Sequence, residues 1–390
     1  MRTRLTAAAA AIALAGSVAA GQAEPVKIGF LATLSGPPAA LGEHARDGFM
    51  LAIEQNDGQL GGVDVEVLIE DDELQPDIAR NRAERFLERD EVDFVAGMIF
   101  SNILQAVFQP VTASETFLIG VNAGTSIYAG AECNPFFFST SWENNQVPEI
   151  MGKYAQDNGY ERIVTLVPNY QAGRDATAGF KHYFEGEVLY EMFTPLGHLD
   201  FSAELARIAS LDPDAVVVFM PGGMGVNLVR QYREAGLADR IPFLSVWTVD
   251  ETTLPATQDA AVGLFSGSQW TPDLDNSANA AFVEAFEAEY GYVPSNFASQ
   301  AYDAALLIGS ALEAVGGDLS DKEAMRQALR AADFASTRGN FRYNTNHFPI
   351  QDYYLVQAIQ REDGQYATTV LEKIFEDYAD LQAEHCPMEW

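Results

Sequence analysis

The feature that most restricts the fold of this chain is a regular alternation of strand and helix patterns that begins at Glu24. Short apolar or alternating segments typical of strands are each followed by segments with apolar residues at helical spacing. The strand patterns lie at 26–31, 63–69, 92–97 and 117–121, and the helical patterns lie at 43–56, at 75–89 and around Ala106. This repeated order predicts a parallel sheet covered by helices on both faces.

A second array of the same kind begins near residue 163. Its strand patterns lie at 163–167, 186–193, 215–220 and 241–245, and its helical patterns lie at 172–184, 202–211 and 224–235. A length of 390 residues leaves room for two domains. We therefore expect two α/β lobes, each with a mostly parallel sheet flanked by helices.

The C-terminal third departs from strict alternation. Three helical patterns, at 277–290, 296–315 and 321–332, follow the second array without a strand between them. They indicate that the chain crosses back to the first lobe. Two strands are expected near 339–343 and 353–360, and a last helix is expected to run into Cys386.

The first 23 residues have the order of an export signal. Met1–Arg4 are short and positive, residues 5–20 are almost all apolar, and Gly21-Gln22-Ala23 supplies small residues for cleavage. A buried or membrane-spanning helix is the alternative, but the apolar run falls short of the roughly 20 residues that a span needs. We expect residues 1–23 to be a signal peptide, cleaved near Ala23, and the mature protein to lie outside the cytoplasm.

Charge and cysteine content add two further expectations. The formal net charge of −33 repels phosphate backbones and anionic lipid, so nucleic acid and membrane-surface partners are disfavoured. The two cysteines, Cys133 and Cys386, suggest one disulfide in an oxidising compartment, which would close a loop of about 250 residues. The alternative is a pair of free thiols.

The loops that follow the strands are rich in small and aromatic residues. In open parallel sheets, ligands bind beyond the carboxyl ends of the strands. Backbone N–H groups at helix starts suit a carboxylate, and tyrosine or tryptophan side chains suit a flat apolar body. The loops concerned are 33–38, 98–102, 122–126, 169–174, 221–224 and 246–248.

Each of these loops also has a simpler structural explanation. Ser101 and Asn102 are suited to capping the helix that follows them, and Gly222-Gly223 is suited to a tight turn. The aromatic residues are suited to the core of a lobe; they are Trp142, Tyr170 and Trp247. Because several strand-end loops share this composition, together they support a ligand cleft more strongly than any one loop does alone.

Catalytic patterns are not found in the sequence. The five histidines are scattered, with no H-E-x-x-H pair for zinc, no G-x-S-x-G elbow and no phosphate-binding loop. The run Gly223-Met224-Gly225 begins like a dinucleotide fingerprint, but its sixth position is Leu228 rather than glycine. We therefore expect no enzyme activity, no cofactor and no metal site. An exported hydrolase is an alternative that would require a nucleophile–base pair or a metal set.

Several segments carry a family resemblance in their order and spacing. They are 28–37, 96–102, 122–125, 138–142, 301–305 and 344–354. Over essentially all of 24–390 the chain resembles the type I periplasmic solute-binding proteins of ABC importers, in the group that binds leucine, isoleucine and valine. The resemblance implies a monomer in the periplasm that captures a small ligand between two lobes by hinge closure and then docks on a membrane permease. A ligand sensor of the same fold, not coupled to transport, is an alternative.

The resemblance also implies how the chain divides. Lobe 1 would comprise 24–139 and 268–337. Lobe 2 would comprise 140–267 and 338–390, with the C-terminal tail returning towards lobe 1. Three crossings, near 139–141, 266–270 and 335–340, would form the hinge.

The ligand residues implied by the resemblance come from both lobes. In the family, loops that match Ser101, Ala123 and Thr125 hold the ligand carboxylate, and Asn102 and Gly124 lie in the same loops. Trp142 also belongs to the expected site. From the second lobe, Tyr170, Ala172, Gly222 and Trp247 would contact the rest of the ligand.

The expected ligand is an aromatic acid. Amino acid binders of the family place a carboxylate near Trp247 to pair with the ammonium group, but here Asp250 is the nearest acid. A buried ammonium without a partner is costly. Cys133, the segment 346–351 and the aromatic-rich loops resemble binders of benzoates or cinnamates. A branched-chain amino acid is the alternative ligand.

Overall fold

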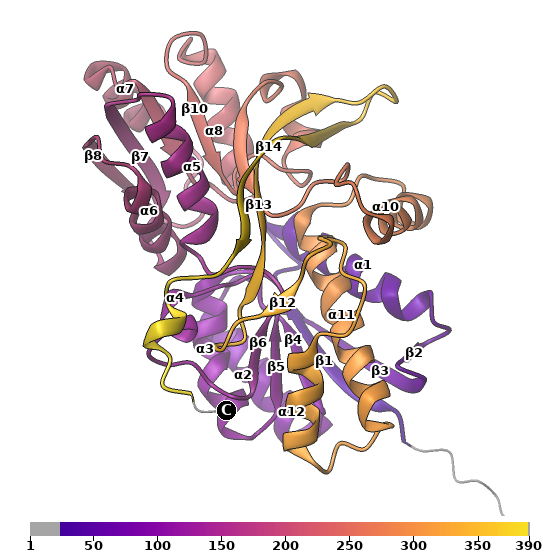
Figure 1. Ribbon diagram of the computed structural model, residues 1–390. Helices are drawn as coiled ribbons and strands as arrows, with labels where there is room; N and C mark the ends of the chain where they lie inside the picture. Colours follow the sequence, from indigo (N-terminus) through magenta and orange to yellow (C-terminus); the bar gives the residue numbers. More distant parts are fainter. Residues whose placement is uncertain (1–23, 389–390) are drawn as a thin grey trace, which may run out of the picture.

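Two sheets form the framework of the structure, a computed structural model that describes residues 24–388 (Figure 1). The segment expected to be a signal peptide, residues 1–23, lies outside the described residues. We call the part of the chain built on the first sheet lobe 1 and the part built on the second sheet lobe 2. This two-lobed α/β arrangement confirms the expected fold class.

The sheet of lobe 1 has six strands in the order β2-β3-β1-β4-β5-β6. All neighbours are parallel except the short β2, which pairs antiparallel with β3. The strands are β1 (Val26–Ala32), β2 (Gln59–Leu60), β3 (Val63–Asp71), β4 (Phe94–Gly97), β5 (Phe117–Gly120) and β6 (Phe137–Ser139). The carboxyl ends of β1, β4 and β5 therefore meet at one edge of the sheet.

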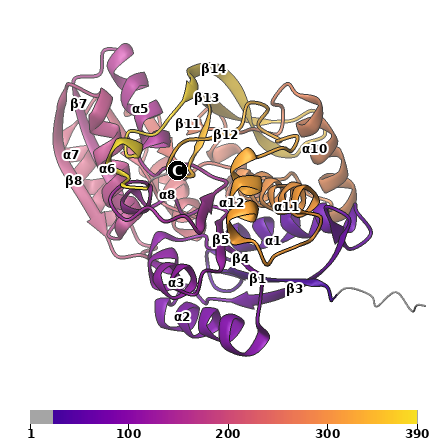
Figure 2. The same cartoon turned by 60° about the horizontal axis from the view of Figure 1, so that its bottom comes forward.

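Helices cover both faces of this sheet. Figure 2 shows α2 and α3 below the strands and α1, α11 and α12 above them. They are α1 (Ala39–Glu54), α2 (Pro76–Arg85), α3 (Ser101–Ala113), α11 (Asn296–Val315) and α12 (Lys322–Ala331). Because α11 packs against α1, the C-terminal third of the chain completes the core of lobe 1. A π-turn (Phe86–Asp90) extends α2, α4 (Ser126–Ala129) follows β5, and α10 (Ser277–Tyr290) packs beside α1.

The sheet of lobe 2 has the order β12-β13-β11-β10-β9-β7-β8, with β14 also paired to β13. The strands are β7 (Arg162–Pro168), β8 (Glu187–Thr194), β9 (Ala215–Val218), β10 (Phe243–Val246), β11 (Phe265–Ser268), β12 (Arg342–Tyr343), β13 (Pro349–Gln360) and β14 (Tyr366–Tyr378). The five strands from β7 to β11 are parallel, and β13 adds an antiparallel edge. The fully buried Ala-Val-Val-Val of β9 shows why the second array reads as apolar runs.

The helices of lobe 2 include α5 (Gln146–Asp157), α6 (Gln171–Tyr183), α7 (Ser202–Leu211) and α8 (Gly223–Glu234). A short α9 (Leu254–Thr257) runs into a 3₁₀ turn, Gln258–Ala260, and another 3₁₀ turn, Ala383–His385, lies in the C-terminal tail. Within residues 24–388, no helix combines the length and the apolar character needed to cross a bilayer.

The final helix expected to run into Cys386 is reduced to the single 3₁₀ turn Ala383–His385, and an unexpected strand precedes it. Residues 366–378 form β14, which pairs antiparallel with β13. The segment contains Thr368, Thr369, Val370, Ile374 and Phe375, which are β-branched or aromatic and favour a strand. Pairing with a long neighbouring strand satisfies its backbone groups, so tertiary context decides the conformation here.

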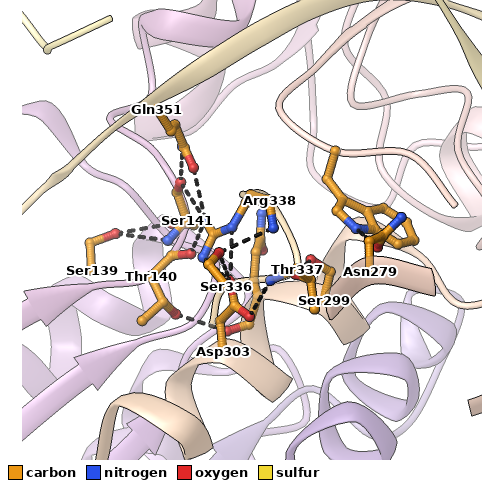
Figure 3. Close-up of polar contacts among 12 residues, drawn as sticks. Ser139, Thr140, Ser141, Asn279, Ser299, Asp303, Ser336, Thr337, Arg338 and Gln351 are labelled. Atoms are coloured by element: carbon orange, nitrogen blue, oxygen red, sulfur yellow. Dashed lines mark hydrogen bonds and ion pairs between the residues drawn. The ribbon is translucent and has the colours of Figure 1, made fainter. Parts of the chain in front are cut away.

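The chain passes between the lobes after β6, after β11 and before β12, and a buried polar cluster lies at these crossings (Figure 3). We call it the hinge cluster; it consists of Thr140, Ser141, Asp303, Ser336, Thr337, Arg338 and Gln351. The Arg338 guanidinium donates to Asp303 Oδ2 from Nε and Nη2 at 3.1 and 2.8 Å. Its Nη1 donates to the carbonyl oxygen of Thr140 and to Gln351 Oε1. The pair has almost no solvent exposure, at 1% for Arg338 and 0% for Asp303.

Asp303 holds the third crossing as well. Its carboxylate accepts from Ser336 Oγ at 2.6 Å and from the Thr337 backbone N–H at 3.0 Å. The Thr337 carbonyl oxygen in turn accepts from Asn276 Nδ2, in the segment that follows β11. The buried ion pair therefore joins the first and third crossings, and Thr337 links the third crossing to the segment that precedes α10.

The expected disulfide is confirmed. Cys133 and Cys386 are bonded, with their Cα atoms 5.6 Å apart and 253 positions apart in the sequence. Cys133 precedes β6 of lobe 1, and Cys386 follows β14 of lobe 2. The bond therefore fastens the C-terminal tail to lobe 1.

Candidate ligand-binding site

A cavity lies between the lobes at the carboxyl ends of both sheets. The empty space in and around it, including the part open to solvent, is about 360 Å³. Lobe 1 and α11 contribute Leu41, Ile99, Phe100, Ser101, Asn122, Ala123 and Phe297; the segment after the first crossing contributes Trp142 and Asn144; lobe 2 contributes Tyr170, Ala172, Phe219, Pro221 and Trp247. None of these residues carries a formal charge. A ligand here would meet aromatic rings, amides, hydroxyls and backbone groups.

Two helix N-termini, those of α3 and α6, open towards this cavity. Phe100 and Tyr170, which both line it, occupy the N-cap positions of these helices, and neither makes a side-chain capping bond. The first turn of a helix leaves backbone N–H groups without intrahelical partners, and its dipole favours negative charge. An anion between the lobes would meet these donors from both sides. Ser101 and Asn102 lie inside α3 and do not cap it.

Aromatic rings form one continuous wall of the cavity. Trp142 stacks on Trp247, with ring centroids 5.2 Å apart and an angle of 21° between the planes. Phe219 meets Trp247 edge-on at 5.0 Å, and Tyr170 lies 6.1 Å from Phe219. Lobe 1 adds Phe100, at 6.3 Å from Tyr170. Such a wall suits a flat apolar ligand.

Trp247 reaches this wall through an unusual backbone conformation. Its φ is 49°, in the left-handed region that bulky residues rarely adopt. The turn around it is held because the Thr248 and Val249 N–H groups both donate to Ser245 Oγ, at 3.2 and 3.0 Å. Strain of this kind is typical of ligand clamps.

Asn144 links the two sides of the cleft. Its Nδ2 donates to Ser101 Oγ at 3.2 Å and to Asp175 Oδ2 at 2.9 Å, and its Oδ1 accepts from the Gly124 N–H at 3.2 Å. The amide orientation is therefore fixed by a donor and two acceptors. Because Ser101 Oγ accepts from Asn144, the Ser101 hydroxyl proton remains available to a ligand.

Asp175, on α6, lies behind Asn144 and not in the cavity wall. It also accepts from Gln171 Nε2 at 2.7 Å. Desolvation by burial raises the pKa of Asp175, although Asn144 and Gln171 donate to its carboxylate. The neutral amide of Asn144 thus stands between this carboxyl group and the ligand space.

Other contacts cross the mouth of the cleft. The Gly223 N–H of α8 donates to the Pro37 carbonyl oxygen of lobe 1 at 3.2 Å. Asn145 Nδ2 donates to Ser126 Oγ, at the start of α4, at 3.1 Å. The lobes are therefore in contact, and the structure shows a closed arrangement.

The site residues expected from the sequence fall into two groups. Six line the cavity, namely Ser101, Ala123, Trp142, Tyr170, Ala172 and Trp247, and four lie outside its lining, namely Asn102, Gly124, Thr125 and Gly222. A side chain on Gly124 would collide with the Trp142 carbonyl oxygen, and Gly222 has a φ of 55° and lies against Leu41. Thr125 Oγ1 and Asn102 Oδ1 are buried polar atoms without a hydrogen-bond partner in the structure.

Several lining residues were not expected from the sequence. Phe100, Asn122 and Pro221 lie in loops that the strand-end argument had selected, so the loop position was a usable signal. Phe297 comes from α11, far along the chain, and carries no local signal. Asn144 is one of two adjacent asparagines before α5, and its role depends on contacts with both lobes.

Metal-ligating side chains are not gathered in this region. Among residues 24–388, no group of three histidine, cysteine, aspartate or glutamate side chains is arranged to hold a metal ion. The residues that line the cavity offer instead the donors and rings described above.

Comparisons with known proteins agree with this geometry. A family model described as "Periplasmic binding protein" matches residues 25–365. The Leu/Ile/Val-binding protein homolog 6 of Brucella melitensis is 27% identical over 360 residues, which cover 90% of this chain and 92% of that protein.

Two solved structures share the fold over nearly their whole length. An ABC transporter solute-binding protein from R. palustris, in complex with benzoate, has a TM-score of 0.87 and 31% identity, and the match covers 93% of this chain and 100% of that one. A substrate-binding protein from Sphaerobacter thermophilus has a TM-score of 0.84 and 36% identity, covering 92% and 100%. The chain therefore belongs to the periplasmic binding protein family.

Proposed function

We propose that this solute-binding protein of the ABC-transporter class captures a small aromatic carboxylate between its lobes. The observation that carries the proposal is the uncharged aromatic cavity onto which two helix N-termini without side-chain caps open, those of α3 and α6. The helix starts would hold the carboxylate, and the rings would hold the flat body. The benzoate complex of the R. palustris relative supports this choice of ligand class.

The polar side of the cavity favours an anion. Ser101 Oγ accepts from Asn144 Nδ2, so its O–H is free to donate to a carboxylate oxygen. Hydrogen bonds to a charged acceptor are stronger than those between neutral groups. We propose that Ser101, together with the backbone N–H groups at the start of α3, forms the main contact of the carboxylate.

The same cavity disfavours an α-amino acid. An ammonium group needs a carboxylate or several acceptors when it is removed from water. No aspartate or glutamate is among the cavity-lining residues, and Asp175 is separated from the ligand space by Asn144. A branched-chain amino acid is the second candidate, because the Brucella relative is named for leucine, isoleucine and valine.

Hinge closure would couple capture to transport. In this proposal lobe 1 comprises 24–139 and 268–337, lobe 2 comprises 140–267 and 338–390, and the hinge lies near 139–141, 266–270 and 335–340. Opening would break the contacts between Gly223 and Pro37 and between Asn145 and Ser126, and a ligand between the lobes would favour the closed state. The closed form, as a monomer in the periplasm, would then dock on the permease of an ABC importer.

Calorimetry with matched ligands tests the proposal. We expect benzoate to bind, benzamide to bind at least about tenfold more weakly because it lacks the charge, and leucine to bind more weakly still. Cyclohexanecarboxylate keeps the charge and loses the aromatic face, so it measures the contribution of the rings. Tight leucine binding with no benzoate binding would overturn the aromatic assignment.

A further inference from the structure

Trp247 separates the ligand cavity from a second cavity. It is the one residue that lines both of them, and it follows directly on β10. The other residues that line the second cavity include Asp250, Glu251, Ser266, Asn296 and Thr368. Asn296 begins α11 of lobe 1, so this rear cavity, like the front one, lies between the lobes.

The rear cavity is lined by two carboxyl groups, whereas the ligand cavity, here called the front cavity, is lined by none. Asp250 Oδ1 accepts from the Thr252 N–H and hydroxyl, and Glu251 Oε1 accepts from the Thr368 N–H and hydroxyl at 2.8 and 2.6 Å. These donors are all neutral. Desolvation raises the pKa of both carboxyl groups, to about 7 for Glu251.

A compensating cation is not built into this cavity. None of its lining residues, all within the described part of the chain, is a lysine, arginine or histidine. Arg361 is close enough for its charge to interact with Glu251, but it is paired with Glu287 and Asp363. Two adjacent buried carboxyl groups therefore face a space that a cationic group would fill favourably.

Trp247 occupies its position between the two cavities at an energetic cost. Trp247 keeps its left-handed φ of 49° and stacks on Trp142. Its side chain is nine-tenths buried, and its indole Nε1 has no hydrogen-bond partner in the structure. A buried indole N–H without a partner is costly, so the arrangement is not explained by core packing alone.

We propose that Trp247 is a specificity-determining partition: it confines the ligand to the front cavity and closes off an acidic rear cavity that can bind an ammonium group. The inference rests on the proposed function, in which the front cavity holds the carboxylate. Ligands that carry a carboxylate at one end and a cation at the other are excluded by the indole ring. With the ring removed, the two cavities join and the site accepts them.

Trp247→Gly tests the partition, because glycine tolerates the positive φ that tryptophan is forced to adopt. The probes are 4-(aminomethyl)benzoate, which is zwitterionic, and 4-methylbenzoate, which has no cation. We expect the wild type to prefer 4-methylbenzoate. In the variant we expect affinity for 4-(aminomethyl)benzoate to rise at least tenfold over the wild type, so that the preference inverts.

A second substitution identifies the source of the gain. Adding Asp250→Asn and Glu251→Gln to Trp247→Gly should abolish the gain, whereas adding Glu284→Gln, at an exposed position on α10, should leave it intact. If Trp247→Gly binds the zwitterion no better than 4-methylbenzoate, or if the gain survives loss of both acids, the partition is wrong.

Two outcomes are kept apart by this design. Failure of the wild type to bind any benzoate would overturn the proposed function. The partition is tested by a separate measurement, the affinity of Trp247→Gly for 4-(aminomethyl)benzoate. Circular dichroism establishes that each variant is folded. Trp247→Asn, which also tolerates a left-handed backbone, replaces Trp247→Gly if the latter does not fold, and it carries the same expectation.

Discussion

The hinge cluster and the ligand cavity both lie where the lobes meet, but they differ in how fully their buried polar groups are hydrogen-bonded. At the hinge, each nitrogen of the Arg338 guanidinium donates to an acceptor, and Asp303 receives four hydrogen bonds. In the cavity lining, the side-chain oxygen of Asn122 and the indole N–H of Trp247 are buried without a partner.

The difference separates a structural interface from a binding interface. A saturated polar network fixes a single geometry, because any movement breaks several bonds at once. Unpartnered groups raise the free energy of the empty closed state, and a ligand that satisfies them lowers it. In the proposed closing motion, the hinge cluster would keep its geometry while the cavity responds to its occupant.

Removing Asp303 should have the largest effect. Asp303→Ala leaves the Arg338 charge buried without its counter-ion, and we expect the free energy of unfolding to fall by about 3–5 kcal/mol. Urea denaturation followed by circular dichroism measures the loss. Glu84→Ala, which breaks the exposed pair with Arg80, should cost less than about 1 kcal/mol. Equal losses of stability in the two variants would show that the buried Arg338–Asp303 pair contributes no more than the exposed Arg80–Glu84 pair.

Glu149, on α5, is a buried acid that contrasts with Asp303. Asp303 is paired with Arg338, whereas the charged group that acts on Glu149 is another acid, Asp380. Desolvation raises the pKa of Glu149 to about 7, although it accepts from Tyr378 Oη at 2.8 Å. Since the folded-state pKa lies above that of the unfolded chain, its contribution is fully present below about pH 4.5 and is lost as pH rises through about 7.

Glu149→Gln should therefore stabilise the protein at high pH. We expect the variant to be more stable than the wild type by roughly 2–3 kcal/mol at pH 8, and to equal it near pH 4.5. Urea denaturation at both values measures this, with the lower pH as internal control. A variant that is less stable than the wild type at pH 8 would show that the carboxylate is compensated after all.

A substitution at Ser101 tests the contribution of a cavity residue to ligand binding. Ser101→Ala removes one donor to the ligand carboxylate, and we expect benzoate affinity to fall about tenfold to thirtyfold, or about 1.5–2 kcal/mol. Because Ser101 Oγ also accepts from Asn144 Nδ2, the unfolding free energy of the free protein should fall as well, by about 1 kcal/mol. Ser114→Ala, at the other end of α3 and bonded to the Val111 carbonyl oxygen, is the matched control. An equal loss of affinity in both variants would contradict the assignment.

The two regions also differ in how far the sequence predicts them. The strand-end argument selects the loops that hold Ser101, Ala123 and Tyr170, because the carboxyl ends of parallel strands share one edge of a sheet. It does not select Arg338 or Asp303, whose side chains meet across 35 positions of the sequence. Local patterns carry no signal for such a pair.

The last strand and Phe297 show the same limit. β14 was not expected, because its pairing with β13 is a tertiary fact that periodicity cannot reveal. Phe297 enters the cavity wall only because α11 returns to lobe 1. In both cases the missing information is which distant segment lies alongside.

Burial of the Arg338–Asp303 pair has a consequence for the medium in which the protein works. Dissolved ions screen exposed charges within about 10 Å at 0.1 M ionic strength, and a chain with a net charge of −33 has much surface repulsion to be screened. Mobile ions do not reach a pair whose side chains are at most 1% exposed. Changes in salinity therefore alter the surface field of this protein while leaving the buried pair at its interlobe crossings unchanged.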